Sequence, residues 1–244
     1  MKTNLAWQWS AFGKHPVASD FFRLGEDTPL LRGFSDWVEK GYHALASIKA
    51  PLHTLHAWRF WARGPQKESI ACGVVRDSSD RVGRPYPLLI MGMGLLNGWE
   101  DHWDLLPFAC ERTWGQIEYL SSFITQDLKK FEQEVQHLRP PLPGWPDFEM
   151  KRKDLGSMEQ QVSVRSDQTA FIFDLKMNAD HDQLTQVNLY HVLIRNQMKS
   201  VPNVVFMGGT LERTCLVLFR RPLQTADFVQ LWSVSKRIGS IHES

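Results

Sequence analysis

The stretch DSSDRVGRPYP, residues 77–87, lies between two apolar runs, IACGVVR at 70–76 and PLLIMGMGLL at 87–96. Short apolar runs bounded by turn-forming residues are typical of buried β-strands, and the continuous run at 87–96 suits a central strand covered on both faces. The stretch between them holds two aspartates, two arginines, a glycine and two prolines. The pattern therefore predicts two strands joined by a compact, charged turn.

The charged turn has two physical interpretations. In the functional one, Arg81 and Arg84 hold a carboxylate or phosphate group, because the guanidinium fork matches both anions. In the structural one, Asp80 caps backbone amides, Gly83 takes a left-handed conformation and an arginine satisfies local carbonyls. Turn chemistry alone favours the structural interpretation, and the functional one stays open.

The residues before this unit predict a loop, a helix and a strand. Residues 11–25 place Gly, Pro, Ser and Asp between phenylalanines, which indicates a loop packed onto the core. Thr28 suits a helix N-cap and Pro29 the first helical position, and the apolar residues that follow keep helical spacing up to Pro51. The aromatic run HAWRFWA at 56–62 suits a strand.

The clearest helical pattern lies between Pro107 and Leu138, where apolar residues recur at spacings of three and four. These residues are Ile117, Leu120, Ile124, Leu128, Phe131, Val135 and Leu138. The segment RPPLPGWPD at 139–147 follows, with four prolines in nine residues. It predicts either a linker or crossover between two halves of the chain or a stiff surface loop within one domain.

Beyond the proline-rich segment, strands and helices alternate. Strands are expected at 170–175, 203–207 and 214–219, and helices at 182–199 and 225–238. Such alternation predicts an α/β layered sandwich with a central mixed β-sheet flanked by helices. A single α/β domain over residues 1–244 is the simplest organisation, and two subdomains divided near 139–147 are the alternative.

Composition argues against several functional classes. The 28 basic and 27 acidic residues give a formal net charge of +1, which argues against a general nucleic-acid surface. No apolar run approaches the roughly 18 residues of a spanning helix, and the first ten residues lack the apolar core of a signal peptide. The cysteines Cys72, Cys110 and Cys215 are far apart and odd in number, which indicates reduced core thiols. We therefore expect a cytoplasmic protein without membrane insertion.

Sequence motifs of known chemistry are missing. The sequence has no GxxxxGK[ST] phosphate loop, no GxGxxG at a helix start and no GxSxG nucleophile turn. His53 and His56 form an HxxH pair, and His102 lies among acidic residues in an expected loop, but zinc needs three or four ligands at known spacings. We therefore predict no catalytic residue, no cofactor and no metal site, and a protein that is not an enzyme.

The charged turn nevertheless resembles a family signature. Ser79-Asp80-Arg81-Val82-Gly83-Arg84, followed by Tyr86-Pro87-Leu88, is similar to the S-x-D-x-x-G-R-x-[FY]-P-L motif of the TagF/ImpM family, which is associated with type VI secretion. Other segments resemble this family in the expected order: Gly13-Lys14-His15-Pro16 with Asp20-Phe21, Trp37, Trp58-Arg59-Phe60, Gly73-Val74-Val75, Val204 and Phe206 with Gly208-Gly209, Arg221-Pro222-Leu223, and Phe228. Two positions depart from the pattern: Ser19 replaces a usual glycine, and Phe206 a common tryptophan.

The resemblance implies a compact α/β protein that acts in the bacterial cytoplasm on the type VI secretion machinery. Its implied role is accessory and regulatory, a post-translational restraint exerted by binding other components such as the forkhead-associated scaffold protein. The family is not known for catalysis, which agrees with the missing motifs.

The expected partner-binding or structural motif combines the charged turn with the loop at 13–22. Its residues are Lys14, Asp20, Ser79, Asp80, Arg81, Gly83 and Arg84. Polar groups of this kind give an interface its specificity and association rate more than its affinity. Two alternatives stay open: an enzyme or small-molecule site that uses Asp80, Arg81 and Arg84 on an anionic ligand, and a purely structural cluster.

Overall fold

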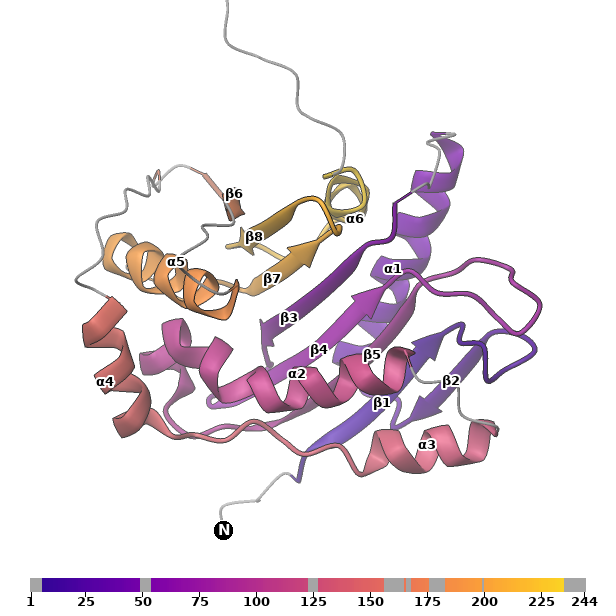
Figure 1. Ribbon diagram of the computed structural model, residues 1–244, viewed down its shortest axis with the longest axis horizontal. Helices are drawn as coiled ribbons and strands as arrows, with labels where there is room; N and C mark the ends of the chain where they lie inside the picture. The colour runs from indigo at the N-terminus through magenta and orange to yellow at the C-terminus, as the bar shows by residue number, and fades with distance from the viewer. Residues whose placement is uncertain are drawn as a thin grey trace, which may run out of the picture.

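The computed structural model describes residues 6–48, 54–122, 127–155, 165, 168–175, 183–198 and 200–234. Its centre is an eight-stranded sheet in the order β2-β1-β5-β4-β3-β7-β8-β6 (Figure 1). The strands are β1 Gln8–Gly13, β2 Phe22–Gly25, β3 Ala57–Arg63, β4 Ser69–Arg76, β5 Leu88–Leu95, β6 Ala170–Leu175, β7 Val204–Gly209 and β8 Thr214–Phe219. Because β3 pairs with β7, segments from both sides of residues 139–147 share this sheet.

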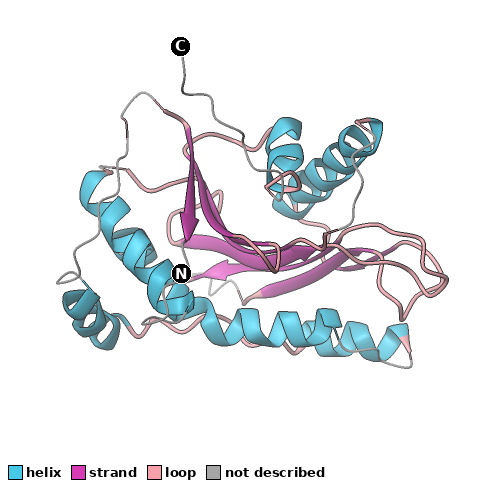
Figure 2. Ribbon diagram, turned by 45° about the horizontal axis from the view of Figure 1, so that its top comes forward, coloured by secondary structure: helices cyan, strands magenta, loops and turns pink. Residues whose placement is uncertain are grey.

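Helices cover both faces of the sheet, as Figure 2 shows. They are α1 Pro29–Ser47, the 3-10 helix η1 Trp99–Leu105, α2 Leu106–Ser122, α3 Leu128–Gln136, α4 Trp145–Leu155, α5 Gln183–Gln197 and α6 Thr225–Leu231. Side chains of α1 and α6 share one core with the sheet, whereas those of α2, α3 and α5 share a second core on its opposite face. The expected α/β layered fold is confirmed.

All seven strand pairings are antiparallel, so the expectation of a mixed sheet is wrong in this respect. A parallel pair requires a helical crossover between neighbouring strands. Here the helical connections join β2 to β3, β5 to β6 and β6 to β7, and none of these are neighbours in the sheet. Strands that are adjacent both in the sequence and in the sheet are joined by direct chain reversals.

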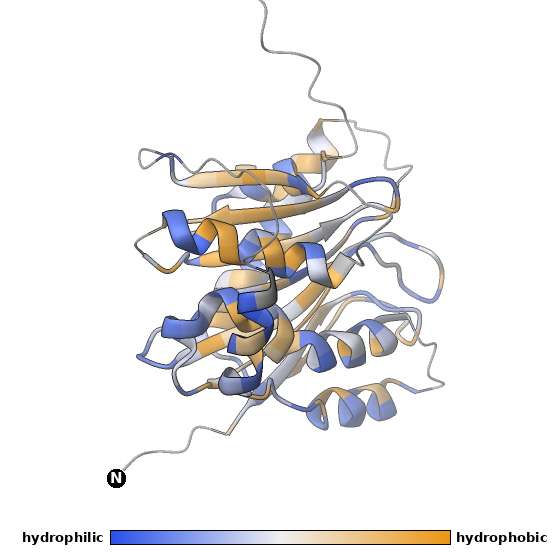
Figure 3. Ribbon diagram, turned by 60° about the vertical axis from the view of Figure 1, so that its left-hand side comes forward, coloured by the Kyte–Doolittle hydropathy of each residue, from blue (hydrophilic) through white to orange (hydrophobic). Residues whose placement is uncertain are grey.

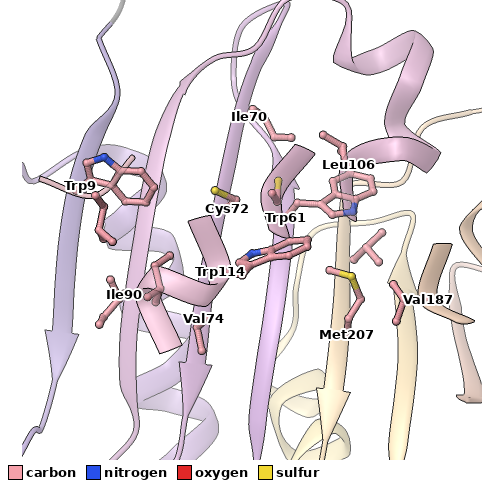
Figure 4. Packing of buried hydrophobic residues seen from close by; sticks show 14 of the residues in the cluster. Trp9, Trp61, Ile70, Cys72, Val74, Ile90, Leu106, Trp114, Val187 and Met207 are labelled. Carbon is pink, nitrogen blue, oxygen red and sulfur yellow. The ribbon is translucent and has the colours of Figure 1, made fainter. Parts of the chain in front are cut away.

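The two apolar runs around the charged turn form β4 and β5 in the interior of the sheet. Successive residues of each strand enter opposite cores: Cys72 and Val74 lie beneath α2, while Ala71 and Val75 face α1. Figure 4 shows Cys72 and Val74 with Trp61 and Trp114 in the first core, and Figure 3 shows that hydrophobic residues concentrate on the strands and on the helix sides facing them. A strand buried on both faces has no polar alternation, which explains the continuous apolar patterns.

Residues 11–25 form strands rather than only a loop, which corrects the sequence-based expectation. β1 and β2 pair antiparallel, with Phe12 opposite Arg23, and the intervening residues 14–21 form the loop. Phe12 and Phe22 are buried on opposite faces. The turn formers that suggested a loop throughout are confined to the connection and to the strand end at Gly13.

The single helix expected between Pro107 and Leu138 is two helices. Asp127 begins the second by accepting a 3.0 Å hydrogen bond from the backbone amide of Lys129. α2 packs on β4 and β5, whereas α3 packs on β1 and β2, and both continue the same apolar stripe. Ile124 of that stripe lies outside the described residues.

The proline-rich segment runs along α2. The carbonyl of Arg139 accepts a 2.9 Å bond from the Thr113 hydroxyl, and the Leu142 amide donates to the Ala109 carbonyl at 3.2 Å. Helix α4 then begins at Trp145, a helix that the sequence patterns did not predict. The Trp145 indole N–H donates to the Asn97 carbonyl at 2.8 Å.

Replacing Thr28 with alanine is expected to lower the free energy of unfolding by about 1 kcal/mol, the usual contribution of an N-cap. The Thr28 hydroxyl accepts a 3.2 Å bond from the Leu31 amide at the start of α1, as the sequence predicts. Urea unfolding would measure the change. The exposed Ser47 hydroxyl at the other end of α1 donates to the His43 carbonyl, so Ser47→Ala is the matched control, with an expected change within about 0.5 kcal/mol. Equal changes in both variants would contradict the assigned cap.

Candidate functional site

The β1–β2 loop (residues 14–21) and the β4–β5 loop (residues 77–87) lie side by side at one end of the sheet (Figure 1). They meet because β1 pairs with β5, with Gly13 opposite Leu88. We call these two segments the paired loops. All seven residues predicted for the partner-binding or structural motif lie in them.

Asp80 is the centre of the paired loops, and its side chain has no exposed surface. Its Oδ1 accepts backbone hydrogen bonds from Val82 at 3.1 Å and Arg84 at 2.9 Å. Its Oδ2 lies 3.0 Å from the Lys14 ammonium and 2.6 Å from Arg84 Nε. Burial raises the pKa of Asp80, but the bonds from the Arg84 amide, Lys14 and the Arg84 side chain outweigh it and hold that pKa well below its usual range.

The backbone of the β4–β5 loop closes a tight turn around this carboxylate. Gly83 has a left-handed φ of 84° and donates to the Asp80 carbonyl at 2.9 Å. Ser79 pairs with Pro85 in an isolated antiparallel bridge. The capping role of Asp80 and the left-handed Gly83 therefore agree with the structural interpretation of this turn.

The two arginines join the loops to each other rather than satisfying carbonyls within their own turn. Arg81 donates through its amide to the Ala18 carbonyl at 2.8 Å and through its side chain to the Val17 carbonyl at 2.7 Å. Arg84 donates to the Ser19 carbonyl at 2.8 Å and lies 3.5 Å from Asp20 Oδ1. These bonds, together with the Lys14–Asp80 pair, hold the paired loops in one arrangement.

The outer side of the paired loops is exposed and combines apolar with charged groups. Val82 is 71% exposed and Phe21 43% exposed, and the Arg84 side chain is 53% exposed despite its bonds to Asp80 and Ser19. Arg81 and Asp20 are exposed beside them. Fixed backbone and exposed apolar groups among charges are the usual features of a protein-binding patch.

Aromatic rings support this surface from behind, and the sequence patterns did not identify their role. Phe21 packs edge-on against Phe12 and Tyr86, with centroid separations of 4.6 and 5.4 Å. Tyr86 also contacts Tyr42 of α1 at 4.9 Å, and the Tyr42 hydroxyl donates to the Pro85 carbonyl at 3.1 Å. The sequence motifs contain Tyr86 and Phe21, but their contact with each other and with Tyr42 joins segments that are distant in the sequence.

The histidines considered as metal ligands lie in different surroundings. His56 Nδ1 lies 3.1 Å from Asp77 Oδ2, while His53 lies outside the described residues. His102 lies in the 3-10 helix η1 rather than in a loop, and its Nε2 lies 2.9 Å from Glu149 Oε1. Across the part of the chain that the structure describes, no three His, Cys, Asp or Glu side chains group as metal ligands. Over the same residues, no helix has the length and apolar character needed to cross a bilayer.

The chain is similar to known proteins in sequence and in fold. Residues 10–138 match the profile of the TagF N-terminal domain, type VI secretion system-associated, which spans more than half of the chain and includes both paired loops. No curated protein matches the chain. The crystal structure of PA0076 from Pseudomonas aeruginosa PAO1 superposes with a TM-score of 0.56 at 18% sequence identity, covering 97% of this chain and 99% of that one.

The structural match supports the fold alone, because the identity is low. The profile match extends from β1 to the residues just after α3 and holds the Gly13-Lys14 and Ser79–Arg84 motifs in one continuous region. The resemblance read from these motifs is therefore confirmed. The chain belongs to the TagF family of type VI secretion system-associated proteins.

Proposed function

We propose that this protein regulates type VI secretion from the cytoplasm by binding another protein of the machinery through the exposed side of the paired loops. Its action is a post-translational restraint, it involves no catalysed reaction, and the forkhead-associated scaffold is the proposed partner. The family assignment supports the secretion context. The exposed surface of the paired loops supports the binding role.

One observation carries this proposal: the charged groups of the paired loops fix a backbone on which Val82 and Phe21 are exposed. Asp80, Lys14 and the two arginines are bonded within the chain, so their main effect is to hold the loops in shape. A rigid surface loses little conformational entropy on association, which favours affinity. The remaining exposed part of each guanidinium adds electrostatic specificity.

The enzyme or small-molecule alternative is less well supported by the same contacts. Arg81 and Arg84 already donate to the Val17 and Ser19 carbonyls and to Asp80, so an anion would meet only their remaining guanidinium donors. The bonds already made tie two segments of the fold together. The arginines are therefore used first to hold the loops in shape.

Val82→Asp is expected to weaken capture of the purified forkhead-associated scaffold by at least about ten-fold, while the melting temperature stays unchanged. The reason is that Val82 is 71% exposed and its loss removes an apolar contact without touching the core. Met150→Asp on α4, where the side chain is 59% exposed, is the matched control and should bind normally. Biolayer interferometry with the immobilised chain gives the affinities.

Two results would count against the proposal. One is an unchanged affinity in Val82→Asp together with a loss in Met150→Asp, which would move the interface to another face. The other is secretion that stays unchanged when the gene for this chain is deleted, since a regulator must change secretion.

A further inference from the structure

A groove of about 610 Å³ opens between α2 and α5, over strands β3 and β7. Trp114, Val187 and Met207 lie along it, and Figure 4 shows these three side chains near one another. Gly208 and Gly209 line it without side chains, which leaves the sheet surface hollow there. The groove lies near the ends of β4 and β7, beside but outside the paired loops.

Two exposed leucines stand at this groove. Leu55, before β3, is 68% exposed, and Leu211, in the turn between β7 and β8, is 99% exposed. Leu211 is the most exposed large apolar side chain among the described residues. Single exposed apolar residues are ordinary, but two at one groove with an apolar lining indicate a contact surface.

The α2 wall of the groove carries more negative than positive charge. Arg59 Nε and Nη2 donate to the two oxygens of Glu118 at 2.7 and 2.8 Å, and Nη1 donates to Glu111 Oε2 at 2.8 Å. One guanidinium thus faces two carboxylates. Glu111 Oε1 accepts no bond from the described residues, and the Glu111 side chain is 39% exposed.

The second cation of the groove is held apart from these carboxylates. Arg76 donates to the hydroxyls of Ser121 and Ser122 at 3.2 and 2.7 Å. Those groups lie at the C-terminal end of α2. Arg76 therefore balances the formal charge of the groove as a whole, but its side-chain hydrogen bonds go to these serines and not to Glu111.

We propose that this groove binds a segment of a partner protein that carries an apolar side chain next to a lysine or arginine. The apolar side chain packs against Leu55 and Leu211 and along Val187 and Met207. The cationic group donates to Glu111 Oε1. This proposal stands apart from the function assigned to the paired loops, because it uses different residues.

The test uses the full chain and two fluorescein-labelled probes, each a roughly 15-residue amphipathic helix with leucines one turn apart. One probe has a lysine beside the leucines, and the other has glutamate at that position. By fluorescence polarisation, the lysine probe should bind at least about ten-fold more tightly than the glutamate probe. Glu111→Gln should remove most of that difference, and Leu211→Asp should weaken the lysine probe by about ten-fold.

Methyl-labelled methionine NMR provides the location of binding. The Met207 signal, assigned through Met207→Leu, should shift on addition of the lysine probe. Absence of binding by both probes, equal binding of both, or an unchanged affinity in Leu211→Asp overturns the proposal. Val82→Asp should leave probe binding unchanged. The groove and the paired loops are therefore tested independently of each other.

Discussion

Acidification from about pH 7 to about pH 5 is expected to lower the free energy of unfolding by about 4 kcal/mol, because two buried histidines stay neutral in the fold. His15 is 1% exposed and His191 is fully buried. Burial lowers the pKa of His15 to about 4, with the charge of Arg76 adding to the effect, although hydrogen bonds to the Ser121 and Leu120 backbone oppose it. Burial likewise lowers the pKa of His191 to about 4 against its bond to the Val187 carbonyl.

The direction of this effect follows from proton binding. The unfolded chain protonates each histidine near pH 6.5, whereas the folded chain does so only near pH 4. Stability is therefore full above the unfolded pKa and falls as the pH drops through this window. Each histidine contributes about 2 kcal/mol of loss by about pH 5.

Urea unfolding at both pH values measures the loss, and a histidine variant assigns it. His191→Leu removes one of the two groups, so the loss between the two pH values should fall to about half. Asp80 acts in a lower window: because its folded pKa is depressed, its contribution is full above the ordinary pKa of an aspartate and is lost as the pH falls from there toward the folded pKa. Equal free energies at both pH values in the unmodified chain would contradict the neutral state of these histidines.

Gly13→Ala is expected to lower the free energy of unfolding by about 3 kcal/mol or more. Gly13 has a φ of 121°, a conformation that side chains rarely adopt. A Cβ atom at this position would lie 2.0 Å from the Pro87 carbonyl oxygen, which is backbone and cannot rotate away. The strain falls where β1 meets β5, so the paired loops would have to shift.

Gly33→Ala is the matched control for that variant. Gly33 lies in α1, and no atom stands within 4 Å of a Cβ built there. Alanine is favoured over glycine in a helix by about 0.5–1 kcal/mol, so this variant should be more stable than the parent. Chemical denaturation of both variants gives the comparison, and a loss of similar size in each would argue against a close approach specific to Gly13.

The strands around the charged turn could be predicted because their signal is local. β4 and β5 are buried on both faces, so nearly every side chain is apolar, and the predicted bounds agree with the structure within one residue at all four ends. β1 and β2 were missed because they are short and the turn formers Gly13 and Pro16 lie between them or at their ends. Glycine and proline also occur at strand ends and on edge strands, so they do not by themselves indicate a loop.

The break between α2 and α3 shows a different limit of sequence patterns. The apolar spacing runs through both helices because each packs on the same face of the sheet. Hydrophobic periodicity shows which face of a helix is buried, but it does not show where one helix ends and the next begins. Here α2 and α3 pack on different strands. Asp127, the N-cap of α3, is a local sign of the new helix. A single aspartate in a polar stretch is common, however, so it does not by itself predict a helix start.

The candidate site could be predicted in its parts and less so in its arrangement. The signature identified Asp80, Gly83 and Arg84, and turn chemistry predicted the capping role of Asp80. The side-chain bonds of Arg81 and Arg84 to Val17 and Ser19 were not predictable, because those residues lie more than sixty positions away in sequence. The groove between α2 and α5 gave no sequence signal, since its lining comes from six separate segments.

Hydrogen–deuterium exchange of the full chain, with and without the purified forkhead-associated scaffold, shows whether the paired loops are the binding surface. We expect slower exchange at residues 17–21 and 81–86 when the scaffold is bound, with little change along α4. Binding that leaves both loops unprotected, or protection confined to other faces, would contradict the claim that the paired loops are the binding surface.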